Sequence, residues 1–320
     1  MSVKPIIIDC YGHATATSLD VECSVATVQF LFSDRKLPGL NAHFGLYVDY
    51  TATAGPDYLR YPKSRRMALL CEPNSSFPFV DQPALANRFC LIFTHDSRLL
   101  SRGAPFLEMP FGTSFIEAVL DEPPEFAKRR LVSMIGAPHP NPQAGHILRN
   151  EVILALSKRN DVDRFGKDVR WIDYKLEGLA DYAFSIAMEN CCRDYYFSEK
   201  IIDCLITETV PIYYGCPGIG RFFDLRGMLV FETLPELQTI LDELTWERYT
   251  EMLQYARANR DRAIAEGWAT RKQLFERVAT AVRAECGNVS TIARSTLFRK
   301  AQDGARVLRQ RFSKRQDENS

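Results

Sequence analysis

The sequence predicts an α/β protein of two domains, each built on a parallel sheet. Short apolar runs alternate with helical patterns along the chain, as expected when helices connect parallel strands. A length of 320 residues exceeds what one hydrophobic core usually supports. The segment 121–130, DEPPEFAKRR, combines two prolines with dense charge, which is typical of an interdomain linker. We therefore predict domains over residues 1–125 and 126–290, followed by a tail over 291–320.

In the first domain, several apolar runs are short enough to be buried strands. They cover residues 6–10, 25–32, 45–49, 67–71 and 89–93.

The second domain continues the alternation of strands and helices. We predict strands over 131–137, 169–174, 182–188, 210–214 and 228–231, and helices over 147–158, 199–207, 245–265 and 269–284. Ser198 stands where it would cap the helix over 199–207. Thr233 and Glu236 have the spacing of a capping box, so a further helix begins there.

Composition excludes several classes of protein. Forty basic and forty acidic residues cancel, so net charge does not attract the chain to nucleic acid. The sequence contains no run of the roughly 18 apolar residues that a membrane-spanning helix needs. Its nine cysteines form no C-x-x-C pair, which favours reduced thiols. We expect a cytoplasmic location.

The stretch 182–215 holds the residues most suited to chemistry. A buried strand ends at Glu189-Asn190, and a helix opens at Ser198-Glu199-Lys200. Open α/β sheets bind ligands at the carboxyl ends of their strands, and a helix N-terminus suits a phosphate group. Lys200 opposes the helix dipole unless it faces an anion, and Glu199 could accept two hydrogen bonds from a ribose diol. The alternative interpretation is that both are solvated surface charges.

Ordered motifs in this stretch resemble the donor-binding region of glycosyltransferase family 10, the α1,3-fucosyltransferases, in its bacterial type. The matching segments are Tyr182-Ala183-Phe184, Glu189-Asn190, Tyr196-Phe197-Ser198-Glu199-Lys200 and Val210-Pro211-Ile212-Tyr213-Tyr214-Gly215, with Val162-Asp163-Arg164-Phe165-Gly166-Lys167 and His146-Ile147-Leu148-Arg149-Asn150 upstream.

This resemblance implies roles for individual residues. Arg149 and Lys200 would contact the diphosphate of the donor, which suits a guanidinium because its fork pairs with two phosphate oxygens. Glu199 would hold the ribose, and Asn190 and Tyr196 would line the donor pocket. For Arg149 the alternative interpretation is a surface arginine on a helix.

In the first domain the resemblance is confined to residues 63–74. The family has a glutamate there, after a basic-then-apolar strand, that is proposed as the general base. Glu72 matches it by position and type, and a carboxylate at a strand's carboxyl end would project into a cleft between domains. The alternative is a surface charge at the edge of a loop, in which case Glu108 and Glu117 are the next candidates in this domain.

The resemblance implies an inverting glycosyltransferase with the GT-B fold, in which two Rossmann-like domains face each other across a cleft. The enzyme would move fucose, or a related sugar, from GDP-fucose or a similar GDP-sugar to a hydroxyl of a glycan. No cofactor or metal is expected, and the D-x-D at Asp161-Val162-Asp163 falls within a motif that we read as structural. The alternatives are the same fold with another nucleotide sugar, or a non-catalytic protein that binds a nucleotide sugar.

The tail over 291–320 is basic and amphipathic. Its apolar residues recur three or four positions apart beneath a basic face, which is typical of a helix at a membrane surface. We predict contact with the inner membrane face through 291–315, and a lipid-linked glycan acceptor in bacterial polysaccharide biosynthesis. A disordered or self-packed cationic tail is the alternative.

Overall fold

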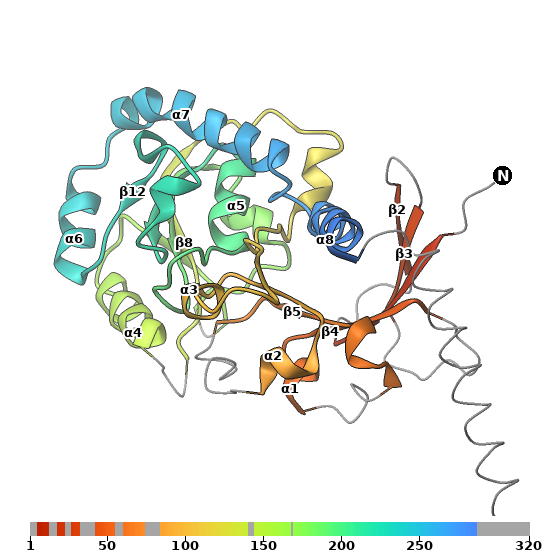
Figure 1. Cartoon of the computed structure of the whole chain (residues 1–320). Coiled ribbons are helices and arrows are strands. Elements are labelled where there is room, and N and C mark those ends of the chain that lie inside the picture. The colour runs from red at the N-terminus through yellow and green to blue at the C-terminus, as the bar shows by residue number, and fades with distance from the viewer. Residues whose placement is uncertain are drawn as a thin grey trace, which may run out of the picture.

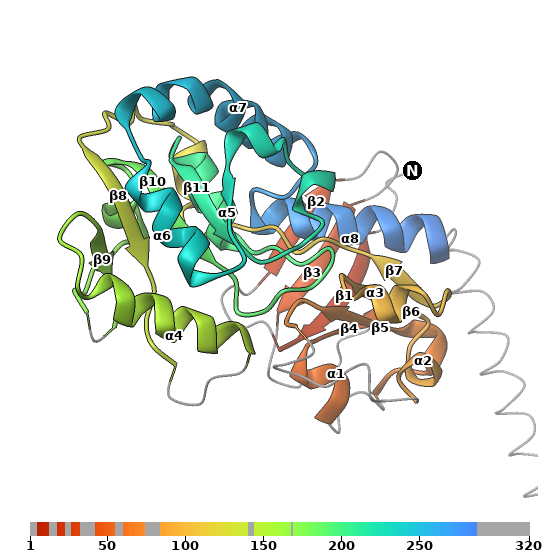
Figure 2. The same cartoon turned by 90° about the vertical axis from the view of Figure 1, so that its left-hand side faces the viewer.

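The computed structural model describes residues 5–12, 18–22, 27–32, 42–54, 60–73, 84–139, 144–167 and 169–286. These residues form two separate sheets of mostly parallel strands, each with helices packed on it (Figure 1 and Figure 2). The first sheet ends at residue 108, and the second begins at residue 130. The α/β architecture with parallel sheets is therefore as predicted.

The first sheet has seven strands in the order β2-β3-β1-β4-β5-β6-β7. Neighbouring strands are parallel, except that β2 and β3 pair antiparallel. The strands are β1 (Ile6–Tyr11), β2 (Ser18–Glu22), β3 (Thr27–Phe32), β4 (Phe44–Val48), β5 (Arg66–Leu70), β6 (Leu91–Thr94) and β7 (Phe106–Glu108). The sequence did not predict β2 and β7, because β2 is largely exposed and β7 has three residues.

Short helices follow the strands of this sheet. They are α1 (Tyr50–Ala54), η2 (Lys63–Arg65), α2 (Leu85–Arg88), α3 (Ser97–Leu100) and η3 (Glu117–Leu120). Together with α8 (Arg271–Cys286), α1 and α2 enclose the middle of the sheet from both faces (Figure 2). Burial on both faces explains why β4, β5 and β6 are apolar at nearly every position.

The second sheet is parallel throughout, with the order β12-β11-β10-β8-β9. Its strands are β8 (Arg130–Ile135), β9 (Asp163–Phe165), β10 (Tyr182–Met188), β11 (Val210–Tyr214) and β12 (Leu229–Val230). Its helices are α4 (Ala144–Leu156), η4 (Lys175–Gly178), α5 (Glu199–Ile206), η5 (Ile219–Arg221), η6 (Leu225–Gly227), α6 (Leu234–Asp242) and α7 (Trp246–Ala265). The predicted capping box of Thr233 and Glu236 is present at the start of α6.

One predicted strand is wrong. Residues 169–174 form bends instead of a strand, and Trp171 and Tyr174 are 72% and 75% exposed. The strand that pairs with β8 at this edge of the sheet is β9, where Phe165 is buried. Trp171 and Tyr174 face solvent, so residues 169–174 lack the half-buried surface that a strand requires.

The helix α8 connects the two halves of the molecule. It follows α7, which packs against α5 and β11, yet its own apolar face lies in the core of the first sheet. Phe275 is fully buried there, and its ring centroid lies 4.9 Å from that of Phe30 and 5.0 Å from that of Phe32. Although α8 falls within residues 126–290, which the sequence assigns to the second domain, its side chains complete the first.

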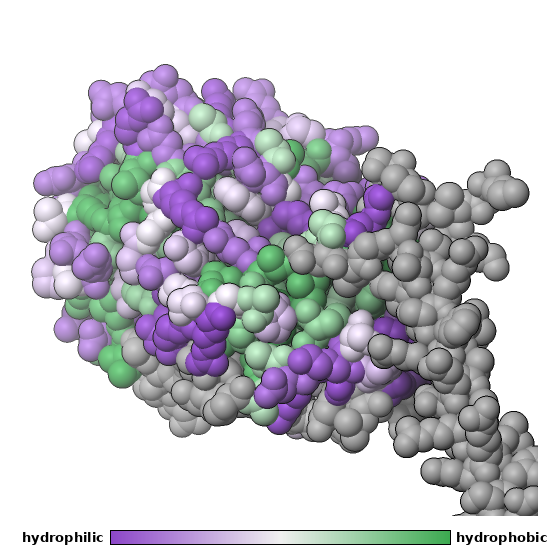
Figure 3. Space-filling model, in the orientation of Figure 1, coloured by the Kyte–Doolittle hydropathy of each residue, from purple (hydrophilic) through white to green (hydrophobic). Residues whose placement is uncertain are grey.

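The surface differs between regions. On the face in Figure 3, hydrophilic residues predominate over α7, and hydrophobic residues gather near the centre, between α7 and α2. No helix within the described ranges combines the length and apolar character required to cross a bilayer. The tail predicted over 291–320 lies outside the described residues.

Replacing Phe275 tests the contribution of α8. We expect Phe275→Ala to lower the free energy of unfolding by about 3–5 kcal/mol, because it leaves a cavity against Phe30 and Phe32. Denaturant unfolding measures the change. Lys272→Ala is the matched control on the exposed side of α8, with an expected change within about 0.5 kcal/mol. Equal midpoints for the two variants would show that α8 does not stabilise the first sheet.

Candidate active site

The candidate site lies where the second sheet changes its winding direction. The chain passes from β8 outward to β9, returns to β10 on the other side of β8, and continues to β11 and β12. In open α/β sheets, ligands bind at the carboxyl ends of the strands that flank such a switch point. Here α4, which carries Arg149, follows β8, and Glu189 follows β10 directly.

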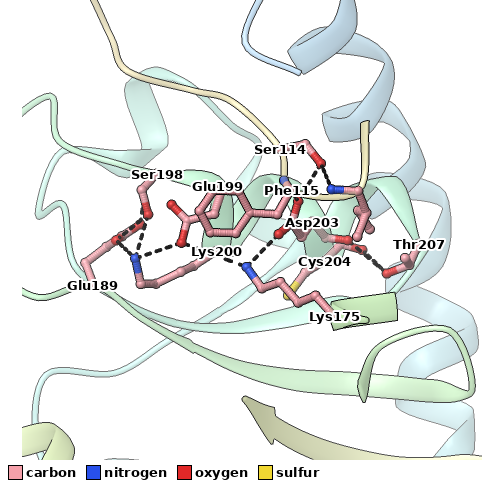
Figure 4. Close-up of polar contacts among 11 residues, drawn as sticks. Ser114, Phe115, Lys175, Glu189, Ser198, Glu199, Lys200, Asp203, Cys204 and Thr207 are labelled. Carbon is pink, nitrogen blue, oxygen red and sulfur yellow. Dashed lines mark hydrogen bonds and ion pairs between the residues drawn. The ribbon is translucent and has the colours of Figure 1, made fainter. Parts of the chain in front are cut away.

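A buried carboxylate organises the loop between β10 and α5 (Figure 4). Glu189 is 0% exposed and accepts hydrogen bonds from the Ser198 backbone N–H (2.8 Å) and the Ser198 hydroxyl (2.7 Å). The Lys200 Nζ lies 3.3 Å from Glu189 Oε2. Ser198 occupies the predicted N-cap position, but its hydroxyl accepts no helix N–H in the described structure. The hydroxyl donates to Glu189 instead, because a carboxylate is a strong acceptor.

Lys200 and Glu199 form a charged pair at the first turn of α5. The Lys200 Nζ lies 2.9 Å from Ser198 Oγ and 3.2 Å from Glu199 Oε1. Burial acts to lower the pKa of Lys200, but the carboxylates of Glu189 and Glu199 outweigh burial and raise that pKa. Burial likewise acts to raise the pKa of Glu199, but Lys200 and Lys175 outweigh it and lower that pKa. Both groups are therefore charged at neutral pH.

Arg149 is a cation of a different kind. Its Nη2 donates to the carbonyl of Met188 at the end of β10 (2.8 Å), and it forms no salt bridge within the described residues. Burial lowers the pKa of Arg149, against the opposing effect of Glu189, Tyr196 and Glu199. A half-buried guanidinium without a carboxylate partner retains capacity to bind an anion.

Asn190 and Tyr196 lie in the loop between β10 and α5. A Cβ on Gly145 of α4 would lie 2.1 Å from the Asn190 carbonyl oxygen, so glycine is required for α4 to approach this loop. The side-chain Oδ1 of Asn190 is buried and has no hydrogen-bond partner in the described structure. The ring of Tyr196 is buried, and its centroid lies 4.8 Å from that of His95, which follows β6. Tyr196 thus joins the two sheets.

Glu72 follows β5 of the first sheet and is influenced by charged residues of the second. The pKa of Glu72 is raised, mainly by burial. The charge of Lys200 opposes this rise, and the charges of Glu199 and Glu189 add to it. These three charges therefore act on Glu72 from the second sheet. Five of the residues selected from the sequence lie around β10 and the start of α5, and the sixth, Glu72, belongs to the first sheet and is affected by the charge of Lys200. The five are Arg149, Asn190, Tyr196, Glu199 and Lys200.

Sequence reasoning missed two residues of the first sheet, of which Asp49 supports the Glu72 backbone. The Asp49 Oδ1 accepts the backbone N–H groups of Cys71 (2.8 Å) and Glu72 (3.0 Å), and Asp49 has a φ of 46°, which aspartate tolerates. Burial is the main cause that raises the pKa of Asp49 to about 7. His95 is 1% exposed, and burial lowers its pKa to about 4, so the ring is neutral. Both residues directly follow strands of the first sheet, as Glu72 does, and that position was the available signal.

A second network of hydrogen bonds and ion pairs, which the sequence analysis did not predict, is centred on Asp203, one turn along α5 from Glu199 (Figure 4). Asp203 is 0% exposed and binds the Lys175 Nζ (2.6 Å), the Ser114 hydroxyl (2.5 Å) and the Phe115 N–H (3.1 Å). The Lys175 Nζ also lies 3.9 Å from Glu199 Oε1. Residues 114–115 belong to the connection between the sheets, so Asp203 fixes this connection against α5.

The other two carboxylates considered in the first domain have partners elsewhere. Glu108 forms a 3.0 Å salt bridge with Arg221. Glu117 accepts the backbone N–H of Arg271 (2.7 Å) at the start of α8. These contacts favour Glu72 among the three.

Comparison with known proteins gives a consistent result. Residues 127–285 match the family model described as Glycosyltransferase family 10 (fucosyltransferase) C-term. The α-(1,3)-fucosyltransferase FucT of Helicobacter pylori is 27% identical over 133 residues, which are 40% of this chain and 27% of that protein. A putative fucosyltransferase-like protein of Arabidopsis thaliana is 36% identical over 78 residues, 23% of this chain and 15% of that protein. The matches thus span about a quarter or less of these relatives.

Similarity of structure extends further along the chain. A crystal structure of an α1,3-fucosyltransferase with GDP-fucose has a TM-score of 0.53 at 18% identity, covering 79% of this chain and 82% of that chain. The Anabaena protein Alr3699/HepE in complex with UDP has a TM-score of 0.50 at 12% identity, covering 75% and 78%. The fold is therefore of the GT-B type, with two Rossmann-like domains.

Variants of Asp49 test the support of the Glu72 loop. Asp49→Ala leaves two backbone N–H groups unpaired, so we expect it to lower the free energy of unfolding by about 1–3 kcal/mol. Asp49→Asn keeps an acceptor oxygen and should lose less. Because the Asp49 pKa is raised in the fold, its protonated form stabilises the native state at low pH. That stability declines as the pH rises from about 4 to about 7.

The asparagine variant does not titrate there, so its stability relative to wild type should increase over this pH range. Denaturant unfolding at pH 4, 5.5 and 7 measures both effects. A constant difference between Asp49→Asn and wild type would contradict the raised pKa.

Proposed function

The C-terminal half of this chain belongs to glycosyltransferase family 10, and from this membership we propose that the protein transfers fucose, or a related sugar, from a GDP-sugar to a hydroxyl group of a glycan. The observation that carries the proposal is the meeting of Arg149, Lys200 and the N-terminus of α5 at the switch point of the second sheet. These groups suit the diphosphate of a nucleotide sugar.

In the proposed complex, the two cations have different tasks. Lys200 is already paired with Glu189 and Glu199, so its position is fixed before the donor arrives. Arg149, which lacks a carboxylate partner in the described structure, would supply most of the new attraction for the diphosphate. Glu199 would accept hydrogen bonds from the ribose, with Asn190 and Tyr196 around the donor.

We propose that Glu72 is the general base of an inverting displacement. The acceptor oxygen would attack the anomeric carbon as the bond from that carbon to the diphosphate oxygen breaks, and Glu72 would take the hydroxyl proton. The pKa of Glu72 is raised, so its carboxylate has a greater affinity for a proton and is a stronger base than that of an ordinary glutamate. Arg149, Lys200 and the dipole of α5 would stabilise the negative charge on the leaving GDP. Because these groups neutralise the leaving diphosphate, we propose that transfer needs no metal ion.

The acceptor and the location follow from the tail. We propose that residues 291–315 lie against an anionic membrane surface, because their sequence combines a basic face with an apolar stripe. A lipid-linked glycan at the cytoplasmic face of a bacterial inner membrane is the acceptor that this location would offer, as in polysaccharide biosynthesis.

A thermal-shift screen tests the donor. GDP at a hundredfold excess over its Kd should stabilise the native state by about 2.7 kcal/mol, and UDP should give no comparable shift. Arg149→Ala is the matched control and should reduce the GDP shift, because it removes the cation that lacks a carboxylate partner. Stabilisation by UDP and none by GDP would assign the site to another nucleotide sugar.

Replacing Glu72 tests the chemistry. Glu72→Gln should lower the rate of sugar transfer by about a hundred- to ten-thousandfold, because the amide cannot take a proton, while GDP affinity stays within about twofold. Transfer by the wild type should decline as the pH falls through the pKa of Glu72, which lies above that of an ordinary glutamate. Initial rates with GDP-fucose as donor measure both.

Glu108→Gln is the control, since Glu108 is engaged with Arg221, and it should retain nearly full activity. Normal transfer by Glu72→Gln would place the base elsewhere.

A further inference from the structure

Phe115 is an unusual residue in this structure. Its side chain is 73% exposed, although a phenylalanine gains free energy by burial. The neighbouring residues Ser114 and Ile116 are 7% and 8% exposed, so the ring projects from a segment that is otherwise packed.

The backbone beneath this ring is held firmly. The Phe115 N–H and the Ser114 hydroxyl both donate to Asp203 Oδ1 (3.1 and 2.5 Å), and the Ile116 N–H donates to Ser114 Oγ (2.9 Å). Ile116 is part of the core of the second sheet. The exposed ring is thus mounted on a fixed support.

The backbone of residues 114–116 is held by Asp203, which lies close to Glu199, the residue proposed to bind the ribose. Asp203 and Glu199 are four residues apart on α5, so they share one face of the helix at successive turns. Lys175 connects them, because its Nζ lies 2.6 Å from Asp203 Oδ2, 3.9 Å from Glu199 Oε1 and 5.1 Å from the centre of the Phe115 ring. Phe115 and Glu199 therefore both approach the same ammonium group, that of Lys175 (Figure 4).

A nucleoside presents matching chemistry. If Glu199 binds the ribose hydroxyls, the base attached to the same ribose lies a few ångströms away and requires a flat apolar surface. An exposed aromatic ring on a fixed backbone provides that surface, and a phenylalanine has few rotatable bonds to order when it is covered.

We propose that Phe115 is the platform on which the purine base of the nucleotide donor stacks, beside the ribose held by Glu199. The inference rests on the proposed function, since it assumes that a nucleotide binds at α5. It assigns part of the donor site to the connection between the two sheets, whereas the other donor residues belong to the second sheet and its helices. Stacking accepts any base, so Phe115 contributes affinity more than selectivity.

Two ligands that differ in the base test this inference. Equilibrium titration of full-length protein with GDP and with ribose 5-diphosphate, which lacks the base, gives a Kd for each. We expect Phe115→Ala to raise the Kd of GDP by about tenfold and the Kd of ribose 5-diphosphate by less than about twofold. Phe115→Tyr keeps an aromatic ring and should bind GDP within about twofold of wild type.

The remaining outcomes separate the explanations. Trp246→Ala, which removes an exposed aromatic side chain at the start of α7, is the matched control and should change neither Kd. Equal weakening of both ligands by Phe115→Ala would mean that the ring acts through Lys175 and Glu199, and would overturn the stacking role. Unchanged GDP binding would also overturn it. Failure of the wild type to bind GDP would instead reject the proposed donor, and this inference with it.

Discussion

The burial of Glu189 is the constraint on which the rest of the site depends. A carboxylate with no exposed surface is stable only when its hydrogen-bonding capacity is satisfied, and here Ser198 and Lys200 satisfy it. Because Ser198 is the residue before α5, this contact fixes where the helix starts relative to the end of β10. It also determines that Lys200 points back toward the sheet. Without Lys200, Glu189 would be an unpaired buried charge, which typically costs about 3–5 kcal/mol. Lys200 therefore stabilises the fold by pairing with Glu189, in addition to binding any ligand.

Once α5 is fixed, its successive turns organise residues from distant parts of the chain. Glu199 faces the site, and Asp203, one turn further on, binds the connection that arrives from the first sheet. At the other end of the chain, α8 returns to the first sheet and completes its core. Two covalent connections thus join the halves of the molecule, and each is packed against both. The ring contact between Tyr196 and His95 adds a third link at the site itself.

The sequence predicted elements whose signal is local and missed those whose partners are distant. The buried strands β1, β4, β5 and β10 are apolar runs of the right length, so Glu72 and Asn190 could be selected because they follow the carboxyl ends of strands. The resemblance to family 10 assigned them to one site. The strand predicted over 169–174 is wrong, because its large apolar side chains Trp171 and Tyr174 are exposed instead of packed against a sheet. The capping role assigned to Ser198 failed because Glu189 competes for its hydroxyl. Asp203 pairs with Ser114 across 89 positions, and no local pattern indicates such a contact.

The charges at the site also affect one another. The Lys200 ammonium is paired with Glu189 and Glu199, and its charge also acts on Glu72. The pKa of Glu72 is raised, whereas that of Glu199 is lowered. Lys200 is the group that opposes this rise. A diphosphate bound at Arg149 and Lys200 would offset their positive charge and so raise the pKa of Glu72 further. Donor binding would then strengthen the proposed base at the moment when the leaving group is in place.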